Sequence, residues 1–312
     1  KIMAITAAMV KELREMTVAG MMDCKKALTN TDGDMDAAVE YLRENGLAKA
    51  AKKAGRIAAE GLVAVALSDD AKAAAIVEVN SETDFVAKND TFQAYVAEVA
   101  DQALTTQAAD IEAFLAEESK AEAGKTVKEA LDGKIAVIGE NLNIRRFSKM
   151  AAEDGFVASY IHAGGKIGVL VHVATDVVND EIKEMGKNVA MQVAAIAPKY
   201  TSRDEVSKDY IDHETEILKI QAKNENPDKP DNIIEKMIIG RLNKELKEVC
   251  LLDQAYVKAE DGKQAVGKYV EQVAKANGAN VTIKEFVRFE TGEGIEKKEE
   301  NFAEEVAKQM GN

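Results

Sequence analysis

The feature of this sequence that most restricts its fold is an internal repeat. The stretch GLVAVALSDDAKAAAIVEV from Gly61 aligns without a gap with GFVASYIHAGGKIGVLVHV from Gly155, so each position of the second copy lies 94 residues after its counterpart. Both copies consist of an apolar run, a polar turn and a second apolar run, which is the pattern of a β-hairpin. The chain is therefore expected to contain two related modules built on small sheets.

Each predicted hairpin is followed by a helical stretch and then by a closing strand. The helical stretches are expected at residues 86–103 and 178–197, and the closing strands in GKIAVIGENLNIRRFSKMA (133–151) and at residues 281–290. Strands and helices thus alternate in blocks within each module, and the predicted fold class is α+β.

The first 45 residues are expected to form three short helices. Each helix is indicated by apolar residues at helical spacing: Val10 and Leu13 in the first, Cys24, Ala27 and Leu28 in the second, and Val39 and Leu42 in the third. Asp34 stands at the N-cap position of the third helix. A bundle of this size is small for independent stability, which suggests that it docks or binds something.

A second non-repeated segment, residues 202–262, interrupts the second module. Its two apolar-spaced arms flank NENPDKPDN, where Pro227 and Pro230 exclude a helix interior. The segment is therefore expected to be an inserted helical hairpin, of coiled-coil type, with a rigid tip. A protruding pair of helices leaves apolar faces that need a partner, which makes self-association a hypothesis.

Together these patterns predict six segments of the chain. In order, they are a three-helix bundle (1–46), a basic linker (47–60), core module 1 (61–152), core module 2 (153–201 and 263–290), the inserted hairpin within it (202–262), and a C-terminal module (291–312).

Composition excludes several classes of protein. The chain has 312 residues, of which 46% are hydrophobic and 31% charged, and no apolar run approaches the roughly 18 residues of a membrane span. We expect a globular, cytoplasmic protein. The two cysteines, Cys24 and Cys250, are too few and too distant for a disulfide framework or a metal site, and we expect both to be buried thiols.

The charge of the chain is unevenly distributed. Residues 1–60 carry a net charge of +1, and the other 252 residues carry −15. Such an acidic body disfavours general binding to phosphate backbones. One basic cluster, Lys49, Lys52, Lys53 and Arg56, has two interpretations: a solvated Ala-rich helix or linker, or a nucleic-acid surface.

Catalytic chemistry has little support in the sequence. The three histidines, His162, His172 and His213, stand near neither cysteine and have no two-histidine metal spacing. The glycine pairs lack the strand and helix context of a phosphate loop. We therefore expect no cofactor, no metal, and no enzyme with covalent chemistry of its own.

The stretch NSETDFVAKND (80–90) places an apolar residue in a polar strand-to-helix corner. In one interpretation Thr83 or Asp84 caps the helix and Phe85 packs inward at its first turn. In the other, Phe85 projects outward as part of a binding surface. The residues of this stretch alone leave both interpretations open.

Several long motifs, in one order along the chain, resemble the elongation factor Ts family. They are MVKELREMTVAGMMDCKKAL, TDFVAKN, IGENLNIRR, HAGGKIGVLV and VRFETGEGIEK. The resemblance implies a ubiquitin-associated-like three-helix bundle, two related α+β core modules, an inserted helical hairpin and a C-terminal helix. It also implies nucleotide exchange on elongation factor Tu during translation elongation, with no direct contact to nucleic acid or membrane.

The resemblance further implies which residues contact the partner. Asp84 and Phe85, flanked by Thr83 and Val86, would press into the nucleotide-binding domain beside its magnesium and phosphate site. The other implied contacts are Arg14, Met21, Met22 and Lys25 on the bundle, Ile138, Gly139 and Asn141 on a second edge, Gln192 in core module 2, and Phe302 and Val306 in the C-terminal helix. Met21, Met22 and Ile138 have an alternative interpretation as core residues.

The sequence departs from the family pattern at three positions. Val18 stands where glycine is usual, Ser81 where cysteine is common, and Gln192 where some members have histidine. Two rival functions remain: a pure interaction scaffold whose bundle binds ubiquitin-like partners, and an RNA-binding protein acting through residues 49–56.

Overall fold

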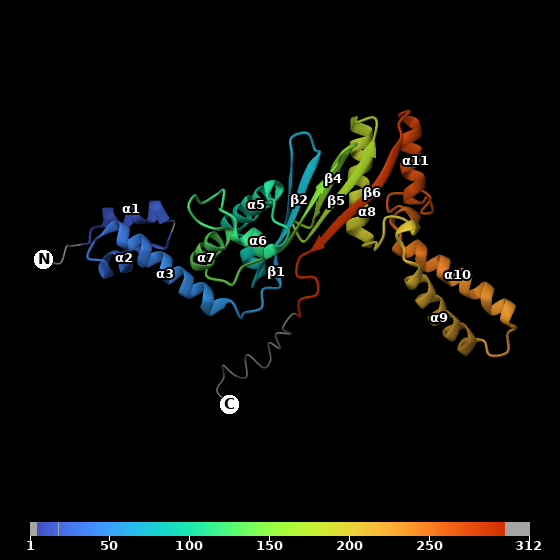
Figure 1. Cartoon of the computed structure of the whole chain (residues 1–312), viewed down its shortest axis with the longest axis horizontal. Helices are drawn as coiled ribbons and strands as arrows, with labels where there is room; N and C mark the ends of the chain where they lie inside the picture. Colours follow the sequence, from blue (N-terminus) through green and yellow to red (C-terminus); the bar gives the residue numbers. More distant parts are fainter. Residues whose placement is uncertain (1–4, 18, 297–312) are drawn as a thin grey trace. The chain divides into compact units, whose positions relative to one another are not determined.

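The computed structural model describes residues 5–17 and 19–296, and the chain divides into two compact units. Of these described residues, the first unit combines 5–17, 19–64, 77–147 and 290–296, and the second combines 65–76 and 148–289. Both units contain helices and strands, labelled in Figure 1, which confirms the predicted α+β fold class.

Three helices form the bundle of the first unit, as the spacing of apolar residues predicts. They are α1 (Ala7–Thr17), α2 (Met21–Asn30) and α3 (Met35–Lys53). The side chain of Asp34 caps α3, because it accepts a hydrogen bond of 2.9 Å from the backbone N–H of Ala37. Cys24 is buried in the bundle core and Cys250 in the second unit, both as free thiols, which confirms their predicted role.

Helix α3 continues beyond the bundle, and its second half packs against α7 (Val127–Ile138). Gly46 is buried at this contact, where a Cβ would lie 3.6 Å from that of Ala136, which is an ordinary van der Waals distance. An ion pair joins Arg43 to Glu129 across the same contact. Residues 47–53, expected to begin a linker, are therefore helical.

The first predicted hairpin and its closing strand form a three-stranded sheet in the order β1-β2-β3. The strands are β1 (Glu60–Leu67), β2 (Ala73–Ser81) and β3 (Asn143–Ala151). Between β2 and β3 lie α4 (Asp84–Ala87), α5 (Asp90–Thr105), α6 (Ile111–Ala116) and α7.

Two details of this module differ from the sequence-based expectation. The helix expected at 86–103 is two helices, because the Asn89 side chain accepts from the backbone N–H groups of Thr91 and Phe92 and starts α5 anew. The closing strand is shorter than expected, since residues 133–138 are helical. A capping box between Thr126 and Glu129 begins that helix, and it buries its apolar residues at helical spacing.

The second unit repeats the strand–helix–strand order. Its sheet has the order β4-β5-β6, from β4 (Phe156–His162), β5 (Ile167–Thr175) and β6 (Val281–Glu290). Strands β4 and β5 are antiparallel, with Phe156 opposite Val173 and His162 opposite Ile167. Helix α8 (Asp180–Ile196) packs on both strands. Helix α11 (Val266–Ala276), which was not expected from the sequence, packs against α8.

The repeat extends to backbone geometry at its first residue. Gly61 has φ of +123°, and a Cβ there would lie 2.2 Å from the carbonyl oxygen of Val79. Gly155 has φ of +73°, and a Cβ there would lie 1.9 Å from the carbonyl oxygen of Val173. Val79 and Val173 are themselves 94 residues apart, so both hairpins use glycine to let one strand approach the next.

The insertion is a helical hairpin of α9 (Lys208–Glu225) and α10 (Asp231–Val249), which lie side by side (Figure 1). Both prolines stand in the tip between the helices, and Pro230 immediately precedes α10. Two separate apolar clusters join the arms. One, at the base, is formed by Tyr200, Val206, Tyr210, Ile211, Leu242, Leu246, Val249 and Cys250. The other, near the tip, is formed by Leu218, Ala222, Ile234, Met237 and Ile238.

Residues 251–256, expected within the insertion, pack into the core of the second unit. The backbone N–H of Leu251 donates to the carbonyl of Tyr200 at 2.8 Å, and Leu251 is fully buried. Tyr256 is also buried, and its ring stacks on that of Tyr269 with centroids 4.2 Å apart. The part of the insertion that stands clear of this core is therefore the pair of helices α9 and α10.

Candidate functional site

The corner between β2 and α4, residues 81–86, presents an exposed aromatic ring. Thr83 is the N-cap of α4, with its hydroxyl oxygen accepting from the backbone N–H of Val86 at 3.4 Å. The side chain of buried Ser81 donates to the carbonyl of Thr83 at 3.0 Å. Phe85 is 79% exposed. The capping interpretation is therefore right for Thr83, whereas the interpretation in which Phe85 packs inward is wrong, and the ring projects outward as the family resemblance implied.

The surroundings of Phe85 are charged. The carboxylate of Asp84 and the ammonium of Lys88, one helical turn later, form an ion pair of 2.6 Å. The Lys88 ammonium also lies 6.0 Å from the centre of the Phe85 ring. An apolar ring is thus presented to solvent next to a half-exposed carboxylate.

Glu140 holds the corner from a distant part of the sequence. Its carboxylate accepts from the backbone N–H groups of Glu82 and Thr83, both at 3.0 Å, and from the hydroxyl of Thr83 at 2.6 Å. In return, the carboxylate of Glu82 accepts from the backbone N–H of Asn141 at 2.6 Å. The corner and the 138–141 edge, which the sequence analysis named separately, are therefore one hydrogen-bonded structure.

The second edge follows directly from the end of α7. Gly139 is the C-cap with φ of +87°, a left-handed conformation that favours glycine. Its carbonyl accepts from the ammonium of Lys53, at the end of α3. The buried side chain of Asn141 donates to the carbonyl of Arg56 at 2.7 Å, and Arg56 itself lies 3.4 Å from Glu82. Ile138 is half-buried.

The expected contact residues of the bundle are on its surface. Met21 is 59% exposed and Met22 is 74% exposed, and Arg14 and Lys25 are exposed as well. The alternative interpretation of the two methionines as core is therefore wrong. Large unbranched apolar side chains held in solvent on a short helix are typical of a contact surface.

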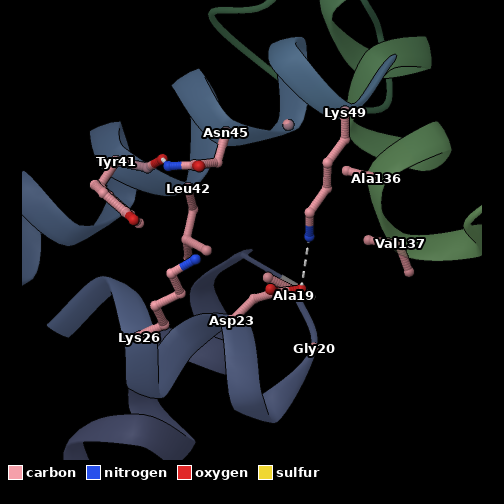
Figure 2. Close-up of a pocket in the computed structure, with 11 residues that line it drawn as sticks. Ala19, Gly20, Asp23, Lys26, Tyr41, Leu42, Asn45, Lys49, Ala136 and Val137 are labelled. Carbon is pink, nitrogen blue, oxygen red and sulfur yellow. Dashed lines mark hydrogen bonds and ion pairs between the residues drawn. The ribbon is translucent and has the colours of Figure 1, made fainter. Parts of the chain in front are cut away.

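A small cavity lies between the bundle and α7, and Figure 2 shows the residues around it. Its volume is about 60 Å³, which leaves room for a few water molecules at most. Lys49 reaches across it to the carboxylate of Asp23 at 3.0 Å, beside Ala136 and Val137 (Figure 2). Two lysines of the basic cluster, Lys49 and Lys53, are thus occupied by contacts within the chain.

Gln192 is placed differently from the other expected contact residues. Its side chain is fully buried under residues 254–257, and it donates to the side chain of Gln254 and the carbonyl of Ala255, both at 3.1 Å. The side-chain amide oxygen of Gln192 accepts from the backbone N–H of Val257 at 2.8 Å. The residue has no exposed surface to offer, so it supports the 254–257 segment instead.

Three residues named from the sequence lie outside the described residues: Val18, Phe302 and Val306. In contrast, two residues of the corner network were missed, Glu82 and Glu140. Glu140 stands between Gly139 and Asn141 in a stretch already singled out, but a sequence motif does not show which carboxylate turns inward.

Within residues 5–17 and 19–296, no three histidine, cysteine, aspartate or glutamate side chains are arranged to hold a metal ion. No helix in the same part of the chain is long and apolar enough to cross a membrane.

Comparison with known proteins agrees with the motifs. The sequence profile of the family described as Elongation factor TS matches residues 82–293. Over 306 residues the chain is 58% identical to Elongation factor Ts of Clostridioides difficile (strain 630), covering 98% of this chain and 99% of that protein. It is 55% identical over 307 residues to Elongation factor Ts of Clostridium botulinum (strain Eklund 17B / Type B), and 52% identical over 306 residues to that of Clostridium tetani (strain Massachusetts / E88), with the same coverage.

Proposed function

The chain belongs to the elongation factor Ts family of translation elongation factors, and from this premise we propose that it is a guanine-nucleotide exchange factor for elongation factor Tu. In this proposal it binds the partner in the cytoplasm, inserts the Asp84–Phe85 corner beside the magnesium and phosphate site, and promotes release of GDP. It makes and breaks no covalent bond itself.

The observation that carries the proposal is the exposure of Phe85 on a fixed backbone. Leaving an aromatic ring 79% in solvent forgoes the roughly 1.5–3 kcal/mol that its burial provides. The Thr83 cap and the Glu140 hydrogen bonds hold the backbone that presents the ring. A ring held in this way is suited to insertion into a partner, where the same burial energy becomes binding energy.

The mechanism follows from thermodynamic linkage. A protein that accelerates GDP release binds the nucleotide-free partner more tightly than the GDP-bound partner, and GDP weakens its binding by the same factor. The wedge would stabilise a partner conformation in which the metal and phosphate ligands are displaced. Either GDP or GTP can then enter, and their concentrations decide which is bound.

Other surfaces would contribute affinity. The exposed methionines of the bundle, with Arg14 and Lys25, are proposed to contact the nucleotide-binding domain, and the 138–141 edge to continue the surface of the corner. Gln192 would act through the 254–257 segment that it supports. Contacts by Phe302 and Val306 remain a proposal from the family resemblance.

The experiment that tests the proposal is release of fluorescent GDP from elongation factor Tu, with and without this protein. The Phe85→Ala variant should melt nearly as the parent does, yet lose roughly tenfold to hundredfold in exchange efficiency, the kinetic equivalent of the burial energy above. Asp84→Ala should act in the same direction but less strongly. Undiminished release by Phe85→Ala would contradict the wedge.

The matched control is Phe92→Ala, seven residues later in the same segment. Phe92 is fully buried, so its truncation should lower the free energy of unfolding by about 3–5 kcal/mol. Release per folded molecule should nevertheless be normal. Comparing the two variants separates loss of the contact from loss of the fold.

The same assay addresses the rival functions. A scaffold that only binds partners would leave GDP release unchanged, and an RNA-binding protein would show a strongly salt-dependent affinity for RNA. Because Lys49 and Lys53 already contact Asp23 and the Gly139 carbonyl, we propose that residues 49–56 stabilise the chain itself rather than bind RNA.

A further inference from the structure

We propose that Glu140 is a positioning residue for nucleotide exchange: its carboxylate holds the corner in the conformation that presents Phe85. This inference rests on the exchange function proposed above. It concerns a residue that would contact neither the nucleotide nor its metal, and would act through the backbone of Glu82 and Thr83.

The corner needs support from outside its own segment. Helix α4 has only four residues, and isolated helices of such length are not stable. Phe85 itself contributes little to the fold, because most of its surface is in solvent. The conformation of residues 82–85 therefore depends on hydrogen bonds to other parts of the chain.

Glu140 supplies those contacts with a single side chain. One carboxylate oxygen accepts from two consecutive backbone N–H groups, of Glu82 and Thr83, and the other accepts from the Thr83 hydroxyl. Hydrogen bonds to an ionised acceptor are stronger than those between neutral groups. A return bond from the backbone N–H of Asn141 to the Glu82 carboxylate links the same two segments in the opposite direction.

The same arrangement connects the corner to α7 and α3. Glu140 follows Gly139, whose left-handed backbone ends α7, and the Gly139 carbonyl accepts from Lys53 of α3. The segment that carries Phe85 is thus connected through hydrogen bonds to two packed helices, and not only to a loop. Because the corner is already ordered in the free chain, binding of the partner costs less conformational entropy.

The expected consequence of losing Glu140 is a smaller fraction of molecules with the corner in place. The apparent dissociation constant rises in inverse proportion to that fraction. We therefore expect Glu140→Ala to raise the concentration of factor needed for half-maximal GDP release by about tenfold. Glu140→Gln should restore part of the loss, because one oxygen still accepts from the two N–H groups and the amide can donate to the Thr83 hydroxyl oxygen.

Two measurements test the proposal, and the first uses the free full-length chain. Hydrogen exchange of the backbone amides of Glu82 and Thr83, followed by NMR, should be faster in Glu140→Ala, and intermediate in Glu140→Gln. Amides of the central strand β2 should keep their protection. Unchanged hydrogen exchange at the amides of Glu82 and Thr83 would overturn the positioning role, independently of any result with the partner.

The second measurement is GDP release by single and double variants. If Glu140 acts through Phe85, the Phe85→Ala/Glu140→Ala double variant should be within about twofold of Phe85→Ala alone, because coupled residues are not additive. A loss of exchange efficiency in the double variant that equals the product of the two single losses would overturn the proposal. Normal release by Phe85→Ala alone would instead contradict the wedge itself, so the two failures are distinguishable.

Glu117→Ala is the matched control for a purely structural carboxylate. Glu117 belongs to the same unit and also accepts from a threonine hydroxyl, that of Thr106 at 2.6 Å, and from the Gln102 amide at 3.3 Å. Its loss should lower the melting temperature but leave unchanged the concentration of factor needed for half-maximal GDP release. If Glu117→Ala and Glu140→Ala raised that concentration equally, then general stability and not positioning of the corner would limit nucleotide exchange.

Discussion

At the scale of single residues, Glu78 in the first unit is a fully buried carboxylate. It accepts from Arg145 at 3.0 Å, from Arg146 at 2.6 Å, and from the backbone N–H of Gly292 at 2.8 Å. Burial raises the pKa of this carboxyl, but its hydrogen bonds with Gly292, Asn80 and the arginines outweigh burial and hold the pKa below its usual value of 4.5. The ionised form thus ties the turn after β6 to β2 and β3.

The sign of the pH dependence follows from that direction. A carboxyl whose pKa is lower in the folded state contributes stability that is fully present above the pKa of the unfolded chain, and that is lost as the pH falls toward the folded pKa. We predict that Glu78→Gln lowers the free energy of unfolding at pH 7 by about 2–4 kcal/mol, since it leaves two arginines without their buried partner. The difference from the parent should shrink below about pH 4.5.

Urea unfolding of both proteins between pH 7 and pH 3.5 measures this difference. The control is Glu98→Gln, because Glu98 is 43% exposed and lies 3.9 Å from its nearest cation, Lys134. That substitution should change stability little at any pH. A difference between Glu78→Gln and the parent that stays constant with pH would contradict the predicted role of the ionised carboxylate.

At the scale of elements, the repeated hairpins and the inserted one are stabilised differently. The β-hairpins depend on backbone approach at Gly61 and Gly155, where a side chain has no space. The helical hairpin depends on two small side-chain clusters, and Ile220 and Ile239 remain 60% exposed on its surface. The first kind of contact tolerates no added atom, and the second kind leaves apolar area for a partner.

Gly61→Ala tests the backbone contact. The new Cβ would meet the carbonyl oxygen of Val79, and the positive φ adds strain, so we predict a loss of at least about 2 kcal/mol in the free energy of unfolding. Gly133→Ala is the matched control, because Gly133 lies inside α7 with open space at its Cβ. It should stabilise the chain by roughly 0.5–1 kcal/mol, as alanine does in helix interiors. Chemical denaturation of both variants measures the contrast, and equal changes would contradict the role of the close approach.

Shortening the helical hairpin tests its independence. Replacing residues 215–241 with a short Gly-Ser turn removes the tip cluster but keeps the base cluster, so we predict that the remaining protein melts as the parent does. Replacing all of residues 202–262 should instead disrupt the second unit, because it removes buried Leu251 and Tyr256. Differential scanning calorimetry distinguishes the two outcomes.

The same shortened protein tests the hypothesis of self-association or partner docking through the hairpin. Its sedimentation behaviour and its exchange activity should be compared with those of the parent at equal concentration. We expect at least one of them to fall. Identical values for both would reject a role of the hairpin surface in assembly or docking.

At the scale of the whole molecule, charge and packing divide the chain in different places. The charge changes sign near residue 60, which favours an independent amino-terminal segment. Packing does not follow that division, since α3 lies against α7, and Arg56 contacts both Asn141 and Glu82. The basic residues that looked like a linker therefore help to hold the first unit together.

Deleting residues 1–56 tests this division. We predict that the remaining acidic chain keeps a cooperative melting transition, because its sheets and helices form their own cores, but at a lower temperature, because α7 loses the helix packed on it. Exchange activity should fall with the loss of the bundle. Loss of cooperative melting would show that the bundle is required for folding. Arg43→Ala, which removes only the ion pair to Glu129, should change melting little, since exposed ion pairs contribute little.

The sequence by itself determined the local elements and the family. Apolar period and caps act over a few residues, and the internal repeat is visible in the sequence itself, so they predicted the bundle helices, the Asp34 cap, a cap at Thr83 or Asp84, the two hairpins and the inserted helices. The positions around Phe85 came from the family resemblance. The same period was ambiguous for the short apolar run at residues 133–138, which were expected in a strand. Helix α11 was not anticipated, although its buried residues Val266, Val270 and Ala274 recur at helical spacing. Only the tertiary structure decided which side chains face outward.

The physical reason is that contacts between distant segments leave no periodic pattern. Glu140 lies 57 residues after Thr83, and the buried position of Gln192 depends on residues more than 60 positions later. Glu140, from another part of the sequence, accepts hydrogen bonds from Glu82 and Thr83, which directly precede the segment of exposed Phe85. Local sequence sets the turn that carries Phe85, and the fold sets the direction in which its ring points.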